Sequence, residues 1–165
     1  MVADVKEEST NFTRVRKESM MVIGIEARTS NGSGAAAADI PKLWEAFYAK
    51  GVLSKIPNKV SDEVIALYCD YEGGYSQPYA FVIGCAVSSL DEVPEGLVAK
   101  TIPASTFAVF HVSGEFPKSL VETWGTIWQS SLQRTYVGDY EVYGKEFSTE
   151  AVKEVDVLVA IEEKR

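Results

Sequence analysis

The stretch IPKLWEAFYAKG, residues 40–51, reads as a helix and leads into two strand-like runs, VIALYCDYEGG at 64–74 and PYAFVIGCAV at 78–87. A further strand-like stretch, residues 12–30, precedes this helix. The second half of the chain repeats this order in the segments LVAKTIPASTFAVFHVSG (97–114), PKSLVETWGTIWQSSL (117–132), GDYEVYGKEF (138–147) and VDVLVAIEEK (155–164). The sequence therefore predicts a duplicated strand–helix–strand–strand unit.

The two predicted units span about residues 12–88 and 97–163, with residues 89–96 as the hinge between them. Such a pattern predicts an α+β fold of antiparallel sheets with two helices packed on one side. Duplicated units of this kind usually pair their sheets and leave a central cleft at the pseudo-twofold seam. Clefts of this kind are where small ligands bind.

Two prolines and a glycine set the predicted helix boundaries. Pro41 and Pro117 each suit the first position of a helix, because proline lacks the N–H that the first turn leaves unpaired. Gly51 is expected to end the first helix in a left-handed conformation. The second helix is expected to run to about Arg134. The small residues 31–38 are predicted to form a linker into the first helix.

The predicted strands differ in which of their faces are apolar. Residues 12–28 are expected to form one long strand or a bent pair. In the run 65–71 one face is predicted to carry Ile65, Leu67, Cys69 and Tyr71, and the other Ala66, Tyr68 and Asp70. In the run 79–87 both faces are apolar, which predicts a central strand that is covered on both sides.

Length, composition and charge restrict the class of protein. The chain has 165 residues, is 46% hydrophobic and carries a net charge of −8, which disfavours a nucleic-acid partner and is compatible with cationic ligands. No run of 18 apolar residues is present, and the acidic start is unlike a secretory signal, so a cytoplasmic protein without a membrane span is expected. Residues 1–10 are predicted to be a flexible tail and residues 11–165 a single domain.

The sequence lacks the common catalytic, nucleotide-binding and metal-binding motifs, so no metal and no cofactor are predicted. Buried thiols are expected for Cys69 and Cys85. A Cys69–His111 dyad is arithmetically possible, but both residues lie in apolar runs that favour core packing. The helical stripe formed by Leu120, Trp124, Ile127, Trp128 and Leu132 is likewise expected to face the core.

Glu141 is the unusual acid of the sequence, because it lies inside the short strand-like run Asp139–Tyr143 and is flanked by tyrosines. Glutamate is depleted in strands, so its presence there requires a reason. Two interpretations stay open on pattern alone. Glu141 is either a functional acid or a solvent-facing residue on an edge strand.

Four segments in register resemble the GyrI-like effector-binding domains. The run Lys100–Gly114 (KTIPASTFAVFHVSG) is similar to their "iPag.yavf.h.G" segment, and Leu67–Tyr71 is similar to their "vy.dyd" strand. The helix with Trp124 and Trp128 and the strand Asp139–Tyr143 follow in matching order. The likeness spans about residues 10–163, although the family's usual Gly-Pro-Tyr is replaced here after His111.

This resemblance implies a site as well as a fold. These domains are the sensor part of AraC-type and MerR-type multidrug regulators, and they also occur alone, including as cationic-drug-binding proteins carried on integron cassettes. With no helix-turn-helix segment in the chain, the stand-alone form is expected. The resemblance implies an aromatic cleft with a buried glutamate that binds cationic, lipophilic molecules. The matching residues, and the aromatic residues available to the cleft, are Glu141, Tyr68, Tyr71, Tyr79, Phe81, Trp124, Trp128 and Tyr143.

Three functions follow as hypotheses. The first is binding of apolar cations, for sensing or sequestration, with a protein partner or homodimer possible. The second is hydrolysis of strained electrophiles, which some relatives of the fold carry out with the corresponding glutamate and an activated water. The third is inhibition of a protein partner, as in the gyrase-inhibitor branch, for which residues 91–96 or 139–146 are candidate acidic surfaces.

Overall fold

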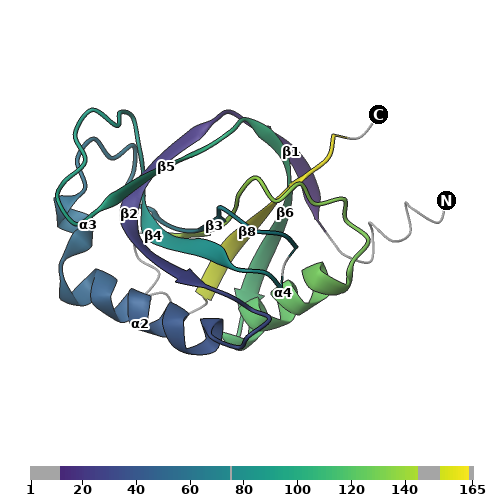
Figure 1. Cartoon of the computed structure of the whole chain (residues 1–165). Coiled ribbons are helices and arrows are strands. Elements are labelled where there is room, and N and C mark those ends of the chain that lie inside the picture. Colours follow the sequence, from purple (N-terminus) through teal and green to yellow (C-terminus); the bar gives the residue numbers. More distant parts are fainter. Residues whose placement is uncertain (1–11, 75, 145–152, 164–165) are drawn as a thin grey trace.

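The computed structural model describes residues 12–74, 76–144 and 153–163, and these form one eight-stranded sheet with helices on one side (Figure 1). The predicted flexible tail, residues 1–10, lies outside the described residues. In chain order the elements are β1 (Thr13–Lys17), β2 (Met20–Thr29), α2 (Ala36–Ala49), α3 (Val52–Lys55), β3 (Val64–Cys69), β4 (Tyr79–Val87), β5 (Val98–Ile102), β6 (Ser105–Gly114), α4 (Lys118–Gln129), β7 (Asp139–Tyr143) and β8 (Lys153–Ile161).

The sheet is one antiparallel layer in the order β1-β6-β8-β7-β3-β4-β2-β5, rather than a pair of separate sheets as expected. The short first strand of each half pairs with the long second strand of the other half: β1 with β6, and β5 with β2. The strands β3 and β7 meet at the centre. The two halves are therefore joined through three strand pairs, and the predicted repeat of element order is present in the topology.

The first helix begins earlier than predicted, at Ala36, so Pro41 lies inside α2 and not at its start. Alanine has the highest helix propensity, and the alanines at 36–38 extend the helix backwards from Pro41. Gly51 has φ +61° and follows the last turn, which confirms the predicted stop. The next residues form the short helix α3.

The second helix is shorter than predicted. It begins at Lys118, directly after Pro117, and ends at Gln129 instead of continuing to Arg134. Ser130 has an extended backbone, and its hydroxyl donates to the Ile127 carbonyl and accepts from the Leu132 N–H. Serine favours such local hydrogen bonds over helix continuation. Residues 130–138 therefore leave the helix and cross the end of β8, where Arg134 forms an isolated antiparallel β-bridge with Ile161.

Apolar side chains cover both faces of the sheet. The helix-facing core includes Ile23, Phe47, Phe81 and Val157, and the opposite core includes Val22, Leu67, Val82 and Phe107. Alternate residues of β4 enter the two cores, as predicted for a central strand. Of the two alternatives for residues 12–28, one long strand or a bent pair, the structure has two strands, β1 and β2. They do not pair with each other: β1 pairs with β6, and β2 pairs with β4 and β5. Among the described residues, no helix is both long and apolar enough to cross a membrane.

Candidate ligand-binding site

A cavity of about 780 Å³ lies between the two long helices and the centre of the sheet. Helix α2 contributes Ile40, Pro41, Trp44 and Tyr48, and helix α4 contributes Leu120, Val121, Trp124 and Trp128. The sheet contributes Tyr68, Tyr79, Glu141 and Tyr143. Both halves of the chain therefore build the cavity, and nine of its twenty lining residues are aromatic. Tyr48, Val121 and Trp128 are also exposed to solvent, so they form its rim.

Glu141 lies in the sheet wall of this cavity. It is 2% exposed and is located on β7, which pairs with β3 on one side and β8 on the other. In this register Glu141 is directly opposite Ala66, a small residue that leaves room for the carboxylate. The edge-strand interpretation of Glu141 is therefore wrong. The prediction of an acidic surface at residues 139–146 is also wrong for residues 139–143, because these form a largely buried strand at the centre of the sheet. Residues 145 and 146 lie outside the described residues.

Three neutral donors hold the Glu141 carboxylate. Tyr68 and Trp124 donate to Oε2 at 2.8 and 2.7 Å, and Tyr143 donates to Oε1 at 2.6 Å. Burial raises the pKa of Glu141, and the three hydrogen bonds oppose that rise by stabilising the ionised form. Glu141 forms no ion pair with any Lys, Arg or His among the residues described. Its charge is thus satisfied by hydrogen bonds but has no cationic partner.

A buried ion pair joins Arg134, which lines the cavity, to Asp139, which does not. Arg134 Nη2 donates to Asp139 Oδ2 at 2.8 Å, and the two side chains are 6% and 0% exposed. Tyr71 donates to the same oxygen at 2.5 Å, and the Ala160 N–H donates to Asp139 Oδ1 at 2.8 Å. Asp139 and Arg134 compensate one another. With both carboxylates ionised, the buried groups Arg134, Asp139 and Glu141 therefore carry a net charge of −1, which is the charge of Glu141.

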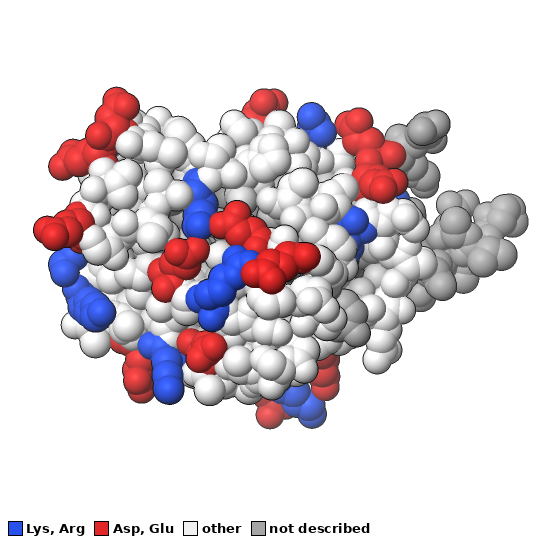
Figure 2. Space-filling model, in the orientation of Figure 1, with Lys and Arg blue, Asp and Glu red and all other residues white. Residues whose placement is uncertain are grey.

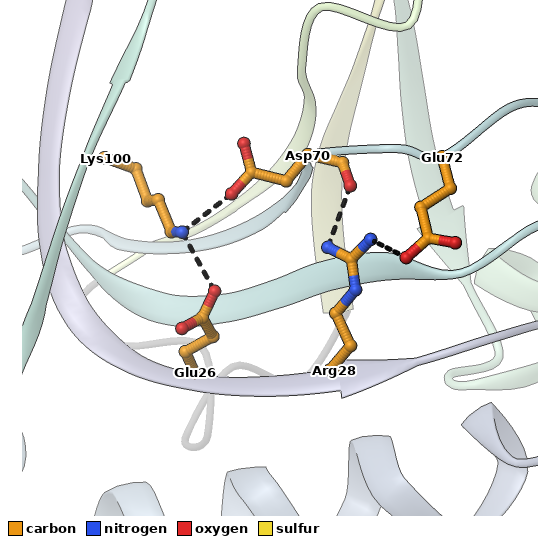
Figure 3. Close-up of polar contacts among 5 residues, drawn as sticks. All are labelled: Glu26, Arg28, Asp70, Glu72 and Lys100. Carbon is orange, nitrogen blue, oxygen red and sulfur yellow. Dashed lines mark hydrogen bonds and ion pairs between the residues drawn. The ribbon is translucent and has the colours of Figure 1, made fainter.

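Tyr71 reaches the cavity because the chain turns at Asp70. Strand alternation alone predicts Tyr71 on the face of Leu67 and Cys69, and that prediction is wrong. Asp70 has φ +52°, a left-handed conformation that Asp tolerates better than most residues, and the turn rotates Tyr71 to the helix-facing side. Arg28 donates to the Asp70 carbonyl at 2.8 Å, and Lys100 contacts the Asp70 carboxylate at 2.7 Å (Figure 3).

Seven of the eight side chains proposed from the sequence line the cavity. They are Glu141, Tyr68, Tyr71, Tyr79, Trp124, Trp128 and Tyr143. Phe81 does not line it, because it is fully buried behind Tyr68, its partner across the β3–β4 pair, with ring centroids 5.0 Å apart. The α4 stripe, expected to be all core, is divided. Ile127 and Trp124 are buried in the core, whereas Trp128 is exposed; Leu120, Trp124 and Trp128 line the cavity.

Several lining residues were not proposed from the sequence. Trp44 and Tyr48 lie one turn apart on α2, with their rings stacked at 6.1 Å, and their helical spacing was a signal that could have identified them. Arg134 and Lys153 gave no such signal. Arg134 comes from the irregular segment after α4, and its position depends on the bridge to Ile161, which no local pattern predicts.

The remaining chemistry-bearing residues do not form a second centre. Cys69 is buried, which raises the pKa of its thiol to about 12. His111 is exposed and contacts Asp156 at 2.7 Å, so its predicted place in the core is wrong and it does not pair with Cys69. No group of three or more His, Cys, Asp or Glu residues in the described part of the chain is arranged to hold a metal ion.

Comparison with known proteins places this chain in a family. Residues 15–161 match Cass2, the integron-associated effector binding proteins. The chain is 30% identical over 143 residues to YobU, a candidate transcriptional regulator of Bacillus subtilis (strain 168), and the match covers 84% of this chain and 89% of YobU.

Two solved structures share the fold. The integron cassette protein VCH_CASS2 of Vibrio cholerae superimposes with a TM-score of 0.70 at 23% identity, covering 92% of this chain and 95% of that one. SAV2435, in a structure bound to tetraphenylphosphonium, gives a TM-score of 0.76 at 16% identity, with 92% and 94% covered. Since the family match includes nearly all the described sheet and helices, the chain belongs to the integron-associated effector binding proteins, with a GyrI-like fold.

Proposed function

We propose that this protein binds lipophilic cations in the cavity between α2 and α4, with Glu141 as the charge partner. The observation that carries the proposal is the carboxylate itself, which is 2% exposed and has no cationic partner among the described residues. A cation that enters the cavity meets a desolvated negative charge, whose attraction is much stronger than it would be in water.

The aromatic wall supports the same class of ligand. Tyr68, Trp124 and Tyr143 donate hydrogen bonds to the carboxylate, and the Trp44 ring packs edge-on against Tyr143 with ring centroids 5.0 Å apart. Aromatic faces attract cations through their quadrupoles and supply apolar area without requiring one ligand shape. Exposed Tyr48 and Trp128 extend this surface to the rim. We therefore expect the cavity to accept apolar cations of more than one shape.

Similarity to known proteins supports the proposal indirectly. SAV2435 has the same fold and has been solved with tetraphenylphosphonium, a cation with four phenyl groups and no hydrogen-bond donor. Such a cation suits a carboxylate whose oxygens already accept three hydrogen bonds. Since the family is named for effector binding, we propose an effector-sensing or drug-sequestering role for this chain.

The experiment compares two ions of equal shape and opposite charge, tetraphenylphosphonium and tetraphenylborate, by tryptophan fluorescence and calorimetry. We expect saturable binding of the phosphonium at about one ligand per chain, with much weaker binding of the borate. Equal affinities for the two ions would mean that the site selects apolar surface alone. Neither ion is a strained electrophile, so hydrolysis is tested separately, by mass spectrometry of a strained electrophile incubated with the protein.

A further inference from the structure

Tyr140, on β7, is a buried tyrosine whose hydroxyl lacks a partner. The residue is 6% exposed, and its hydroxyl forms no hydrogen bond with any described residue. The residues opposite it in the sheet are Leu67 and Leu158, whose side chains offer neither donor nor acceptor. The Tyr140 hydroxyl is not sealed, in contrast to the Thr29 hydroxyl, which is unpaired and has no access to solvent. A buried polar group without a partner requires an explanation.

The Tyr140 side chain lines a cavity of about 500 Å³, which we name the Tyr140 cavity. It shares no lining residue with the cavity between α2 and α4. Because side chains alternate along a strand, Tyr140 and Val142 of β7 line the Tyr140 cavity, whereas Glu141 lines the other one. The Tyr140 cavity therefore lies on the opposite face of the sheet, and its size is within the range of small-molecule sites.

The floor of the Tyr140 cavity is apolar. Leu158 is buried, and the neighbouring Val109 and Val142 are half-buried although they lie on inner strands of the sheet. The core on this face consists of strand residues alone in the described part of the chain, so no helix covers these valines. A molecule that covers them removes apolar surface from water, which favours binding.

We propose that the Tyr140 cavity is a second binding site, which takes small, uncharged and largely apolar molecules that carry one oxygen acceptor, such as a ketone or an ether. The acceptor receives a hydrogen bond from the Tyr140 hydroxyl, and the apolar body covers Val109 and Val142. This site is independent of the proposed cation binding at Glu141, because it lies on the other face of the sheet.

The surroundings of Tyr140 prepare its hydroxyl to donate. The Phe107 ring packs edge-on against the Tyr140 ring, with centroids 5.5 Å apart and an interplanar angle of 73°, and so holds the phenol in place. Burial raises the pKa of Tyr140 to about 12, so the phenol stays protonated at neutral pH. A fixed, neutral phenol offers one O–H donor to a ligand.

The charged groups at the Tyr140 cavity disfavour an ionic ligand. Glu18, Glu63 and Asp156 line it together with Lys17, so acids outnumber bases and repel an anion. None of these three carboxylates is buried. A cation gains little from them, because exposed charges are screened by water and salt, and Asp156 already contacts His111 at 2.7 Å.

The test uses 4-tert-butylcyclohexanone as the probe and methyl-group NMR of the whole chain as the readout. We expect saturable shifts of the Val109, Val142 and Leu158 methyl groups, with a Kd in the millimolar range or tighter, as suits a ligand of this size. The methyl groups of Leu120 and Val121, at the other cavity, should not shift. The anion 4-tert-butylcyclohexanecarboxylate has the same apolar body and should bind about fivefold more weakly or less, because its charge loses hydration beside acidic groups.

The variant Y140F removes the hydroxyl and keeps the ring. A neutral hydrogen bond of ordinary strength corresponds to roughly a fivefold change in affinity, so Y140F should bind the ketone about fivefold more weakly. Y136F is the matched control, because Tyr136 stacks on Arg134 and lines neither cavity. It should keep the wild-type affinity.

Each outcome decides the proposal. Shifts that are absent at Val109 and Val142, or confined to Leu120 and Val121, would overturn the site. Equal ketone affinities in folded Y140F and the wild type would overturn the role of the hydroxyl. Carboxylate binding as tight as that of the ketone would overturn the uncharged ligand class, and this comparison and the methyl map need no variant to fold. Failure of phosphonium binding would contradict the proposed function and leave this site unaffected.

Discussion

At the scale of single residues, Glu141 combines burial with a negative charge that only neutral groups hydrogen-bond. Ionised carboxylates are rarely buried unless they are paired, because they lose the hydration that water supplies. The donors Tyr68, Trp124 and Tyr143 replace that hydration without removing the charge. Burial and the nearby carboxylate raise the pKa of Tyr68 and Tyr143 well above their usual value, so both phenols remain protonated donors.

The variant Glu141→Gln should keep the cavity and remove its negative charge. Loss of one partner of a desolvated charge pair costs about 2–5 kcal/mol, so affinity for tetraphenylphosphonium should fall by roughly 30-fold or more. Calorimetry measures the affinity, and circular dichroism checks that the variant is folded. A folded variant with wild-type affinity would show that the cation does not depend on Glu141.

Cation binding should also depend on pH. Burial holds the ligand-free pKa of Glu141 above its usual value, and a bound cation favours the ionised form. Affinity should therefore be full above the ligand-free pKa and should decline as the pH falls through it. The other charged and titratable groups that line the cavity are Tyr48, Tyr68, Tyr71, Tyr79, Tyr143, Arg134 and Lys153. Burial raises the pKa of each of these tyrosines above its usual value, so the tyrosines keep their protons over the range in which Glu141 titrates.

Tyr143→Phe tests the cause of this pH dependence. The substitution removes the 2.6 Å hydrogen bond to Oε1, which stabilises the ionised carboxylate. The pKa of Glu141 should rise further, and the midpoint of the pH-dependent binding should move to higher pH. Titrations of one phosphonium from pH 4 to 9 measure the midpoint. Tyr140→Phe is the control, because Tyr140 faces the opposite core; an equal shift in both variants would exclude the hydrogen bond as the cause.

At the scale of elements, the left-handed turn at Asp70 decides which face Tyr71 occupies. The ion pairs around it join β2, β5 and the end of β3, because Lys100 contacts both Glu26 and Asp70 while Arg28 contacts Glu72 (Figure 3). Surface ion pairs contribute little individually. The structural effect comes from the bond between Arg28 and the Asp70 carbonyl, which is a backbone group within the turn.

The pair of variants Asp70→Ala and Asp70→Gly separates backbone conformation from charge. Both remove the contact with Lys100, but only Ala disfavours the left-handed conformation, by roughly 1–2 kcal/mol. We expect Asp70→Ala to weaken phosphonium binding about fivefold or more through displacement of Tyr71, and Asp70→Gly to weaken it less. Calorimetry on both proteins is the measurement. Equal losses in the two variants would assign the effect to the ion pair and not to the turn.

Elements with regular periodicity were predicted well from the sequence, whereas interruptions of that periodicity were not. The alternation in β4 and the stop at Gly51 are local properties, set by side-chain spacing and backbone freedom. The turn at Asp70, in contrast, depends on a neighbour that is distant in the sequence. Arg28 is 42 residues from the Asp70 carbonyl it contacts, and a pattern read along the chain does not contain that contact.

At the scale of the whole molecule, the two halves depend on one another. The sheet is continuous because β3 of one half pairs with β7 of the other at its centre, and β1 and β5 each cross to the other half at its edges. The cavity takes one long helix from each half (Figure 1). The repeated element order was visible in the sequence. Its pairing into one sheet was not, since strand partners are chosen by three-dimensional packing. The same limit applies to the site: Glu141 was found through its unusual position in a strand, and Arg134 had no comparable signal.

The charge of the whole molecule leads to a last prediction, that the chain does not bind duplex DNA. The net charge is −8, and on the face in Figure 2 acidic and basic side chains are interspersed, without a continuous basic patch. DNA affinity arises largely from the release of counterions by clustered lysines and arginines, which this surface does not offer. Fluorescence anisotropy with a labelled duplex at low salt measures binding. Micromolar affinity that falls steeply with added salt would contradict the prediction and would require a basic surface that the face in Figure 2 does not carry.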